Sequence, residues 1–91
     1  PMRSSAASDV YKRQLEGSNV LHEACSTRNW KLVGKTNLFH TYATSSSLEV
    51  EKQFAAHYIW IRTFDYSETW VRLGIPTSKY EWTRVRQALN Q

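Results

Sequence analysis

The C-terminal residues 65–91, DYSETWVRLGIPTSKYEWTRVRQALNQ, contain the clearest secondary-structure signals of this chain. Pro76 disfavours the α conformation at Ile75, and the spacing of Ser78 and Glu81 is that of a helix N-terminal capping box. After this cap, apolar residues recur at helical spacing, and they are Trp82, Val85, Ala88 and Leu89. The pattern predicts a final helix that begins after Ser78 and has one apolar side.

The segment before Pro76 is expected to be a shorter helix over residues 66–73. Asp65 or Ser67 can cap its start, and Gly74 stands where a helix commonly ends in a left-handed residue. Two helices joined by a turn at Gly74 and Pro76 therefore form the expected C-terminal unit.

The preceding residues 47–64 allow two interpretations. Ser46 and Glu49 repeat the capping-box spacing, and the apolar pattern that follows favours one long helix over residues 47–64. The alternative is a β-hairpin over residues 58–75, because both of its halves are rich in β-forming residues.

The hairpin has a preferred register, with Ile61 opposite Leu73. Because side chains alternate between the two faces of a strand, this register gives one apolar face: Ile59, Ile61, Val71, Leu73 and Ile75. The other face is aromatic and basic: Tyr58, Trp60, Arg62, Trp70 and Arg72. The capping signal favours the helix, so we expect a mostly α fold, a small helical domain with a C-terminal helix-turn-helix-like hairpin. The alternative is an α+β fold with the hairpin at residues 58–75 and a C-terminal helix.

Residues 66–89 resemble a helix-turn-helix DNA-binding unit. In that family a leucine precedes the turn glycine and an aliphatic residue follows it, as Leu73, Gly74 and Ile75 do here. Trp70 departs from the small residue that the family has at that place. The resemblance implies that the second helix enters the major groove and that DNA is contacted by Ser78, Lys79, Tyr80, Thr83, Arg84, Arg86 and Gln87. A non-catalytic module that binds DNA through its C-terminal helix is the first functional expectation.

Residues 19–54 resemble partial ankyrin repeats. Val20-Leu-His-Glu-Ala24 is similar to the Leu-His-x-Ala start of a repeat, residues 30–33 stand where its second helix would be, and residues 38–43 give a second partial match. The two copies are 18 residues apart, whereas ankyrin repeats have a period near 33. The resemblance implies a fragment of an ankyrin-type domain that binds another protein, and this is the alternative function.

The N-terminal head differs from the rest in composition. Residues 8–14 resemble a translated sequencing adapter, which would be a scar that has no part in the fold. We expect residues 1–14 to be a disordered head and residues 15–91 a single small domain, a C-terminal fragment of a longer protein; the alternative is an ordinary terminus that begins a helix at Asp9. The formal charge is +4, but residues 15–91 hold nine Lys and Arg against seven Asp and Glu, so charge alone does not indicate an anionic partner.

Catalytic and metal sites are not indicated by any motif. A zinc-protease motif beginning at His22 would lack its second histidine. Nothing in the sequence fixes a histidine against Cys25 as a general base. The three glycines of the chain do not form a glycine-rich phosphate-binding loop. We therefore expect no catalysis, no cofactor, no metal and no small-molecule substrate. No apolar run reaches the roughly 20 residues of a membrane helix, and a single cysteine favours a reducing, intracellular compartment, cytoplasmic or nuclear.

Overall fold

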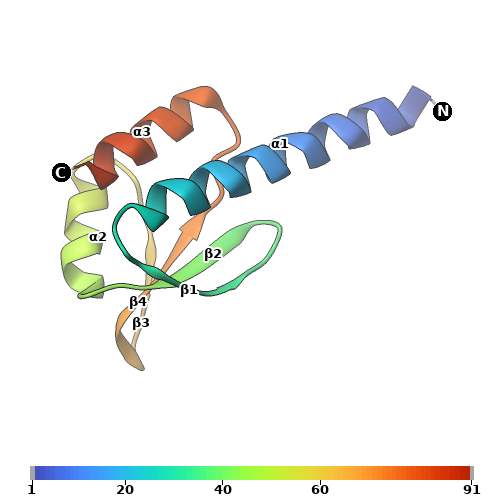
Figure 1. The fold of residues 1–91 in the computed structure, drawn as a ribbon. Helices are drawn as coiled ribbons and strands as arrows, with labels where there is room; N and C mark the ends of the chain where they lie inside the picture. The colour runs from blue at the N-terminus through green and yellow to red at the C-terminus, as the bar shows by residue number, and fades with distance from the viewer. Residues whose placement is uncertain (1, 91) are drawn as a thin grey trace.

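The computed structural model describes the backbone of residues 2–90 and the side chains of residues 9–90. Its elements follow one another as α1 (Met2–Ser26), β1 (Lys31–Lys35), β2 (Phe39–Ala43), α2 (Ser47–Ala55), β3 (Arg62–Phe64), β4 (Ser67–Gly74) and α3 (Lys79–Leu89). The strands form an antiparallel sheet in the order β1-β2-β4-β3 (Figure 1). The described residues therefore have an α+β fold.

The expectation of a mostly α fold is wrong, and the α+β alternative is the one observed. The helix expected over residues 66–73 is strand β4, and the helix expected over residues 47–64 ends at Ala55. Arg62 pairs with Arg72 and Thr63 with Val71, which is the register that places Ile61 opposite Leu73. The paired backbone groups satisfy one another in the sheet, and the β-forming residues there fit a pleated surface better than a helix.

The N-terminal half also differs from expectation. Residues 31–35 and 39–43 are strands, where the ankyrin resemblance implies helices. Residues 2–14, for which we expect a disordered head, belong to α1, and the described side chains of residues 9–13 are exposed. Pro1 lies outside the described residues, and the adapter origin of residues 8–14 stays a prediction.

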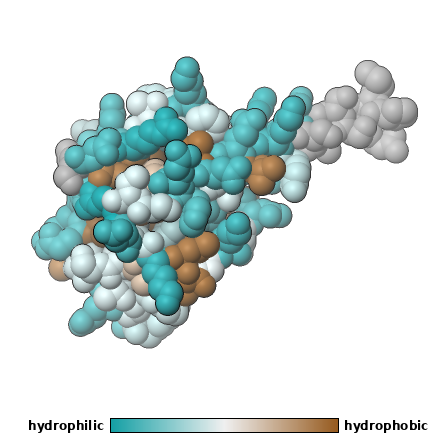
Figure 2. Space-filling view, viewed as in Figure 1, coloured by the Kyte–Doolittle hydropathy of each residue, from teal (hydrophilic) through white to brown (hydrophobic). Residues whose placement is uncertain are grey.

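The molecule has two layers, with the helices on one side of the sheet (Figure 1). Helix α1 lies along α3 and extends past the end of the sheet, while α2 packs on β4. Strand alternation turns one set of side chains toward the helices, and the buried apolar core consists of Leu21, Cys25, Tyr42, Val50, Phe54, Val71, Leu73, Val85, Ala88 and Leu89. In the view of Figure 2 the surface over α1 and α3 is largely hydrophilic, and apolar residues form separate patches.

Both predicted helix caps are present. The Ser78 side chain accepts a hydrogen bond from the Glu81 N–H at 3.2 Å, and Ser46 accepts one from the Glu49 N–H at 3.3 Å. The Glu81 carboxylate accepts from the backbone N–H and the hydroxyl of Thr77, and these bonds lower the pKa of Glu81. The start of α3 is therefore fixed by local side chains, as the sequence indicates.

Gly17 is the point of closest approach between α1 and the segment that leads into α3. A Cβ atom at this buried position would lie 2.0 Å from the carbonyl oxygen of Pro76 and 2.8 Å from the Ile75 side chain. A side chain of any size would therefore push α1 away from residues 75–76. The glycine allows these two backbones to touch.

Replacing Gly17 with alanine is expected to destabilise the protein. Alanine gains about 1 kcal/mol of helix propensity, but overpacking at a closed contact costs about 1–3 kcal/mol, and here the contact is with a backbone atom. The urea midpoint of Gly17→Ala should fall below that of the parent chain. Gly34→Ala is the matched control, because a Cβ there meets nothing within 4 Å. A Gly17→Ala variant more stable than the parent would contradict the packing of α1.

Candidate functional site

The side of the sheet away from the helices carries aromatic and basic side chains. In β2 and β4, Thr41 lies opposite Arg72 and Ala43 opposite Trp70. Because His40, Val71 and Leu73 point into the core, alternation turns Phe39, Trp70 and Arg72 outward. We define the aromatic face as Phe39, Arg62, Phe64, Tyr66, Trp70 and Arg72.

Three rings of the aromatic face cluster at the β3–β4 hairpin. The centroids of Phe64 and Tyr66 are 5.3 Å apart, and Trp70 lies edge-on to both, at 6.5 Å from Phe64 and 6.2 Å from Tyr66. These separations are those of favourable aromatic pairs. Tyr66 is nonetheless 75% exposed, so the cluster presents ring surface to solvent as well as packing within itself.

Two arginines lie side by side next to this cluster. Arg62 and Arg72 are directly opposite each other on neighbouring strands, and like charges in that position are destabilising. The Arg72 guanidinium lies 4.2 Å from the centroid of the Phe39 ring, a cation–π contact. An anion bound between the two arginines would relieve their repulsion.

A shallow hollow of about 370 Å³ lies over this part of the sheet. Its lining includes Phe39, Phe64, Tyr66, Trp70 and Arg72 from the aromatic face, together with residues 33–36 of β1 and the turn after it. Asp65 and Glu68 are the acidic residues of the adjoining hairpin, and both are exposed. The hollow therefore combines ring surfaces with positive charge, and its acidic neighbours lie at one end.

The residues expected to contact DNA lie on α3 and its cap, and some are already engaged. Ser78 caps the helix, and the Thr83 hydroxyl donates to the Lys79 carbonyl at 2.9 Å. Arg84 is half-buried, and its Nη2 donates to the carbonyls of His57 at 2.7 Å and Tyr58 at 3.0 Å. The exposed members are Ser78, Lys79, Tyr80, Thr83, Arg86 and Gln87.

The helix that a helix-turn-helix unit needs before the turn is absent from the described residues, because residues 67–74 are strand β4. Helix α3 follows that strand and packs against α1 and α2. The exposed side of α3 is therefore supported by a strand and by α1 and α2, not by the preceding helix that the resemblance implies. Three members of the aromatic face, Arg62, Trp70 and Arg72, belong to the outward face expected for the alternative hairpin, whereas Phe39, Phe64 and Tyr66 do not. No local pattern indicates Phe39, because the β2–β4 pairing that places it there joins distant residues.

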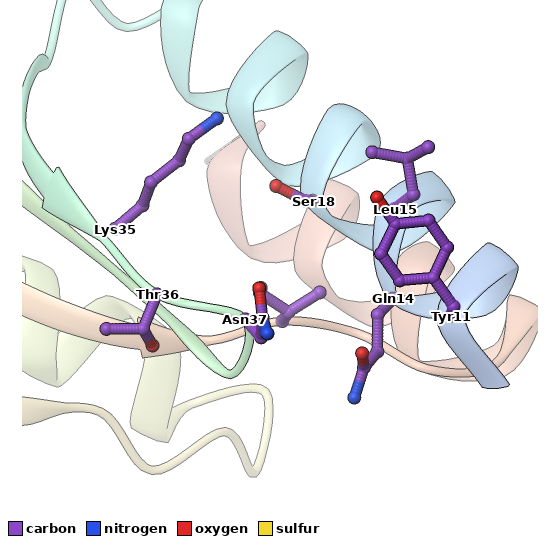
Figure 3. Close-up of a pocket in the computed structure, with 8 residues that line it drawn as sticks. Tyr11, Gln14, Leu15, Ser18, Lys35, Thr36 and Asn37 are labelled. Carbon is purple, nitrogen blue, oxygen red and sulfur yellow. The ribbon is translucent and has the colours of Figure 1, made fainter. Parts of the chain in front are cut away.

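A buried polar chain connects α1 to the sheet. Ser18 Oγ and His40 Nε2 are 2.8 Å apart, and His40 Nδ1 is 2.8 Å from the Tyr42 hydroxyl. Ser18 lines a cavity of about 200 Å³ between α1 and the β1–β2 hairpin; Figure 3 labels Tyr11, Gln14, Leu15, Ser18, Lys35, Thr36 and Asn37 around it.

The hydrogen-bonded Ser18 and His40 have the spacing of a nucleophile and its general base, but the pKa values of the groups here do not suit catalysis. Burial, with the charges of Lys35 and His22, lowers the pKa of His40 to about 4, whereas an efficient base has a pKa near the working pH. Burial raises the pKa of the Cys25 thiol to about 12, so Cys25 is not a thiolate nucleophile. Among the described residues, no group of three or more His, Cys, Asp or Glu side chains could hold a metal ion. We interpret the Ser18–His40–Tyr42 chain as a structural connection.

No known protein family matches the chain, and no curated protein matches it either. The helix-turn-helix and ankyrin resemblances therefore stay predictions, and function has to be argued from geometry. Within the part of the chain that the structure describes, no helix is both long and apolar enough to cross a membrane.

The His40 environment predicts a stability that depends on pH. The folded protein holds His40 neutral with a pKa of about 4, against 6.5 for an unperturbed histidine, so the unfolded chain binds a proton first as the pH falls. Stability should decrease between pH 6.5 and pH 4, by up to about 3 kcal/mol from this group. Urea unfolding at pH 7, 5.5 and 4 measures this decrease in the free energy of unfolding. His40→Gln should flatten the decline, and an equally steep decline in that variant would contradict the assignment.

Proposed function

We propose that this chain is a non-catalytic nucleic-acid-binding module and that its aromatic face binds unpaired nucleotides. The observation that carries the proposal is a ring cluster, Phe64, Tyr66 and Trp70, beside the directly paired Arg62 and Arg72. It lies on the side of the sheet opposite the helices.

Each component of the aromatic face suits one part of a nucleotide. Bases stack on aromatic rings whatever their sequence, and one such stack contributes about 1–3 kcal/mol. Arginine forms short, charge-assisted hydrogen bonds with phosphate oxygens, and such an anion would offset the repulsion between Arg62 and Arg72. Four-stranded sheets with exposed rings are one established framework for binding single strands.

The shape of the site favours single strands over duplex. Base pairs in a duplex are stacked on one another, and proteins reach their edges with a helix or a ribbon that enters a groove. The aromatic face is part of a sheet with a shallow hollow, so it offers ring planes but no projecting element. Unpaired bases can lie flat on those rings.

The exposed side of α3 is the second candidate surface, and it would bind duplex DNA. Lys79, Tyr80, Arg86 and Gln87 are all exposed there, and they are among the residues that the helix-turn-helix resemblance implies. A protein partner bound through an ankyrin-type fragment is less well supported, since residues 31–35 and 39–43 are strands. The intracellular location stays a prediction.

Binding should be lost when the aromatic face is changed and kept when α3 is changed. Fluorescence anisotropy of a labelled mixed-sequence single-stranded oligonucleotide, titrated with the full chain, measures the affinity. Tyr66→Ala and Arg62→Ala are expected to weaken it, Tyr66→Ala by roughly five- to hundred-fold from the stacking energy. The double variant Lys79→Ala, Arg86→Ala is the control. Both target positions are exposed, so the fold should survive.

Two further readings of the same titration separate the alternatives. A single strand that meets Arg62 and Arg72 should give a slope of log affinity against log salt of about −1.4. Tight duplex binding that depends on Lys79 and Arg86 and not on Tyr66 would establish α3 as the interface. Absence of binding to single and double strands alike would refute the proposed function.

A further inference from the structure

The loop between α2 and β3 presents a second aromatic surface outside the aromatic face. Trp60 is 79% exposed and Tyr58 is 76% exposed, although both are large aromatic residues. Their neighbours Ile59 and Ile61 pack against the core. Exposure alternates along this stretch, with Ile59 and Ile61 half-buried and Trp60 exposed, so Trp60 points away from the core.

This loop is held in one shape. Tyr58 has a φ of 60°, a left-handed conformation that is strained for a bulky residue and costs about 1–3 kcal/mol unless its surroundings fix it. Arg84 of α3 provides that support by donating to the carbonyls of His57 and Tyr58. The Ile59 N–H also donates to the Phe54 carbonyl at 3.0 Å. A ring on a rigid loop loses little entropy when a ligand packs against it.

Trp60 is continuous with the aromatic face. It stands two residues before Arg62, and Arg62 is opposite Arg72. Two residues further along β4, Gly74 lines a hollow of about 260 Å³ together with Trp60. A Cβ at Gly74 would meet nothing within 4 Å, so the surface of the sheet at Gly74 is open. Successive residues on the same face of a strand are about 7 Å apart.

The charges around Trp60 are compatible with a polyanion. Glu81 lines the same hollow, but its carboxylate accepts from the N–H and hydroxyl of Thr77 at the start of α3, where the helix dipole offsets its charge. Arg84 lines the hollow too, with its guanidinium 5.4 Å from the centroid of the Tyr80 ring. Arg84 thus gives this hollow a positive charge, as Arg62 and Arg72 do for the aromatic face.

We infer that Trp60 is a second base-stacking site and that a bound single strand runs from the Tyr66 cluster across the Arg62–Arg72 pair to Trp60. This extension rests on the proposed function. From Trp70 to Gly74 the strand β4 rises by about 13 Å, and stacked bases on one strand are about 3.4 Å apart. The path therefore spans up to about four base steps, more than a trinucleotide covers.

A length series of oligonucleotides tests the extension. Binding of the full chain to oligodeoxythymidylates of three, six and nine nucleotides is measured by competition with a labelled oligonucleotide. The parent chain should bind the hexamer more tightly than the trimer and gain little beyond it. Trp60→Ala should lower hexamer affinity by at least about five-fold while leaving trimer affinity unchanged, and Trp60→Phe should restore the hexamer. Tyr66→Ala, in contrast, should weaken all three lengths.

The outcomes separate this extension from the proposed function. Equal hexamer affinity in Trp60→Ala and the parent chain, or an equal loss at every length, would overturn the extension while the binding function stands. Absence of binding by the parent chain at every length would overturn both. Unfolding midpoints of the Trp60 variants equal to that of the parent exclude a folding defect as the cause.

Discussion

The pairing of β3 with β4 is the interaction on which the rest of the structure depends. With Arg62 opposite Arg72, the two-residue alternation sends Val71 and Leu73 into the core and the arginines outward. A slip of one residue would exchange the two faces. Burying an aliphatic side chain contributes about 1.5–3 kcal/mol, whereas two like charges across a strand pair cost at most about 1 kcal/mol. Core burial therefore determines the register, and the exposed arginine pair is its consequence.

The same alternation in β2 fixes α1. His40 and Tyr42 point inward, and the hydrogen bond between His40 and Ser18 connects the sheet to α1. One position earlier in that helix, Gly17 lets α1 approach residues 75–76. A polar group buried in this way is stabilising only while it stays paired. The helical layer is thus positioned by the inward side chains of the sheet, and the outward side chains remain available for a ligand.

Local signals in the sequence were sufficient for the final helix and for both serine caps, because capping depends on residues three positions apart. They were insufficient between residues 47 and 75. The helical spacing of Val50 and Phe54 is real, since both are buried on α2, but the helix ends at Ala55 and residues 62–64 pair with β4 instead. Of the aromatic face, only Arg62, Trp70 and Arg72 were predicted to point outward together, as part of the alternative hairpin. The Ser18–His40 contact spans 22 residues, and no local pattern indicates it.

An NMR titration tests the central claim that ligand binds the sheet and not the helix. The full chain, labelled with ¹⁵N, is titrated with a single-stranded oligonucleotide, and amide shifts are followed residue by residue. If the ligand binds the aromatic face, the largest changes occur in β2, β3 and β4, together with the indole signal of Trp70, and changes across α3 are small. Changes confined to residues 79–87 of α3, with the sheet unaffected, would contradict it.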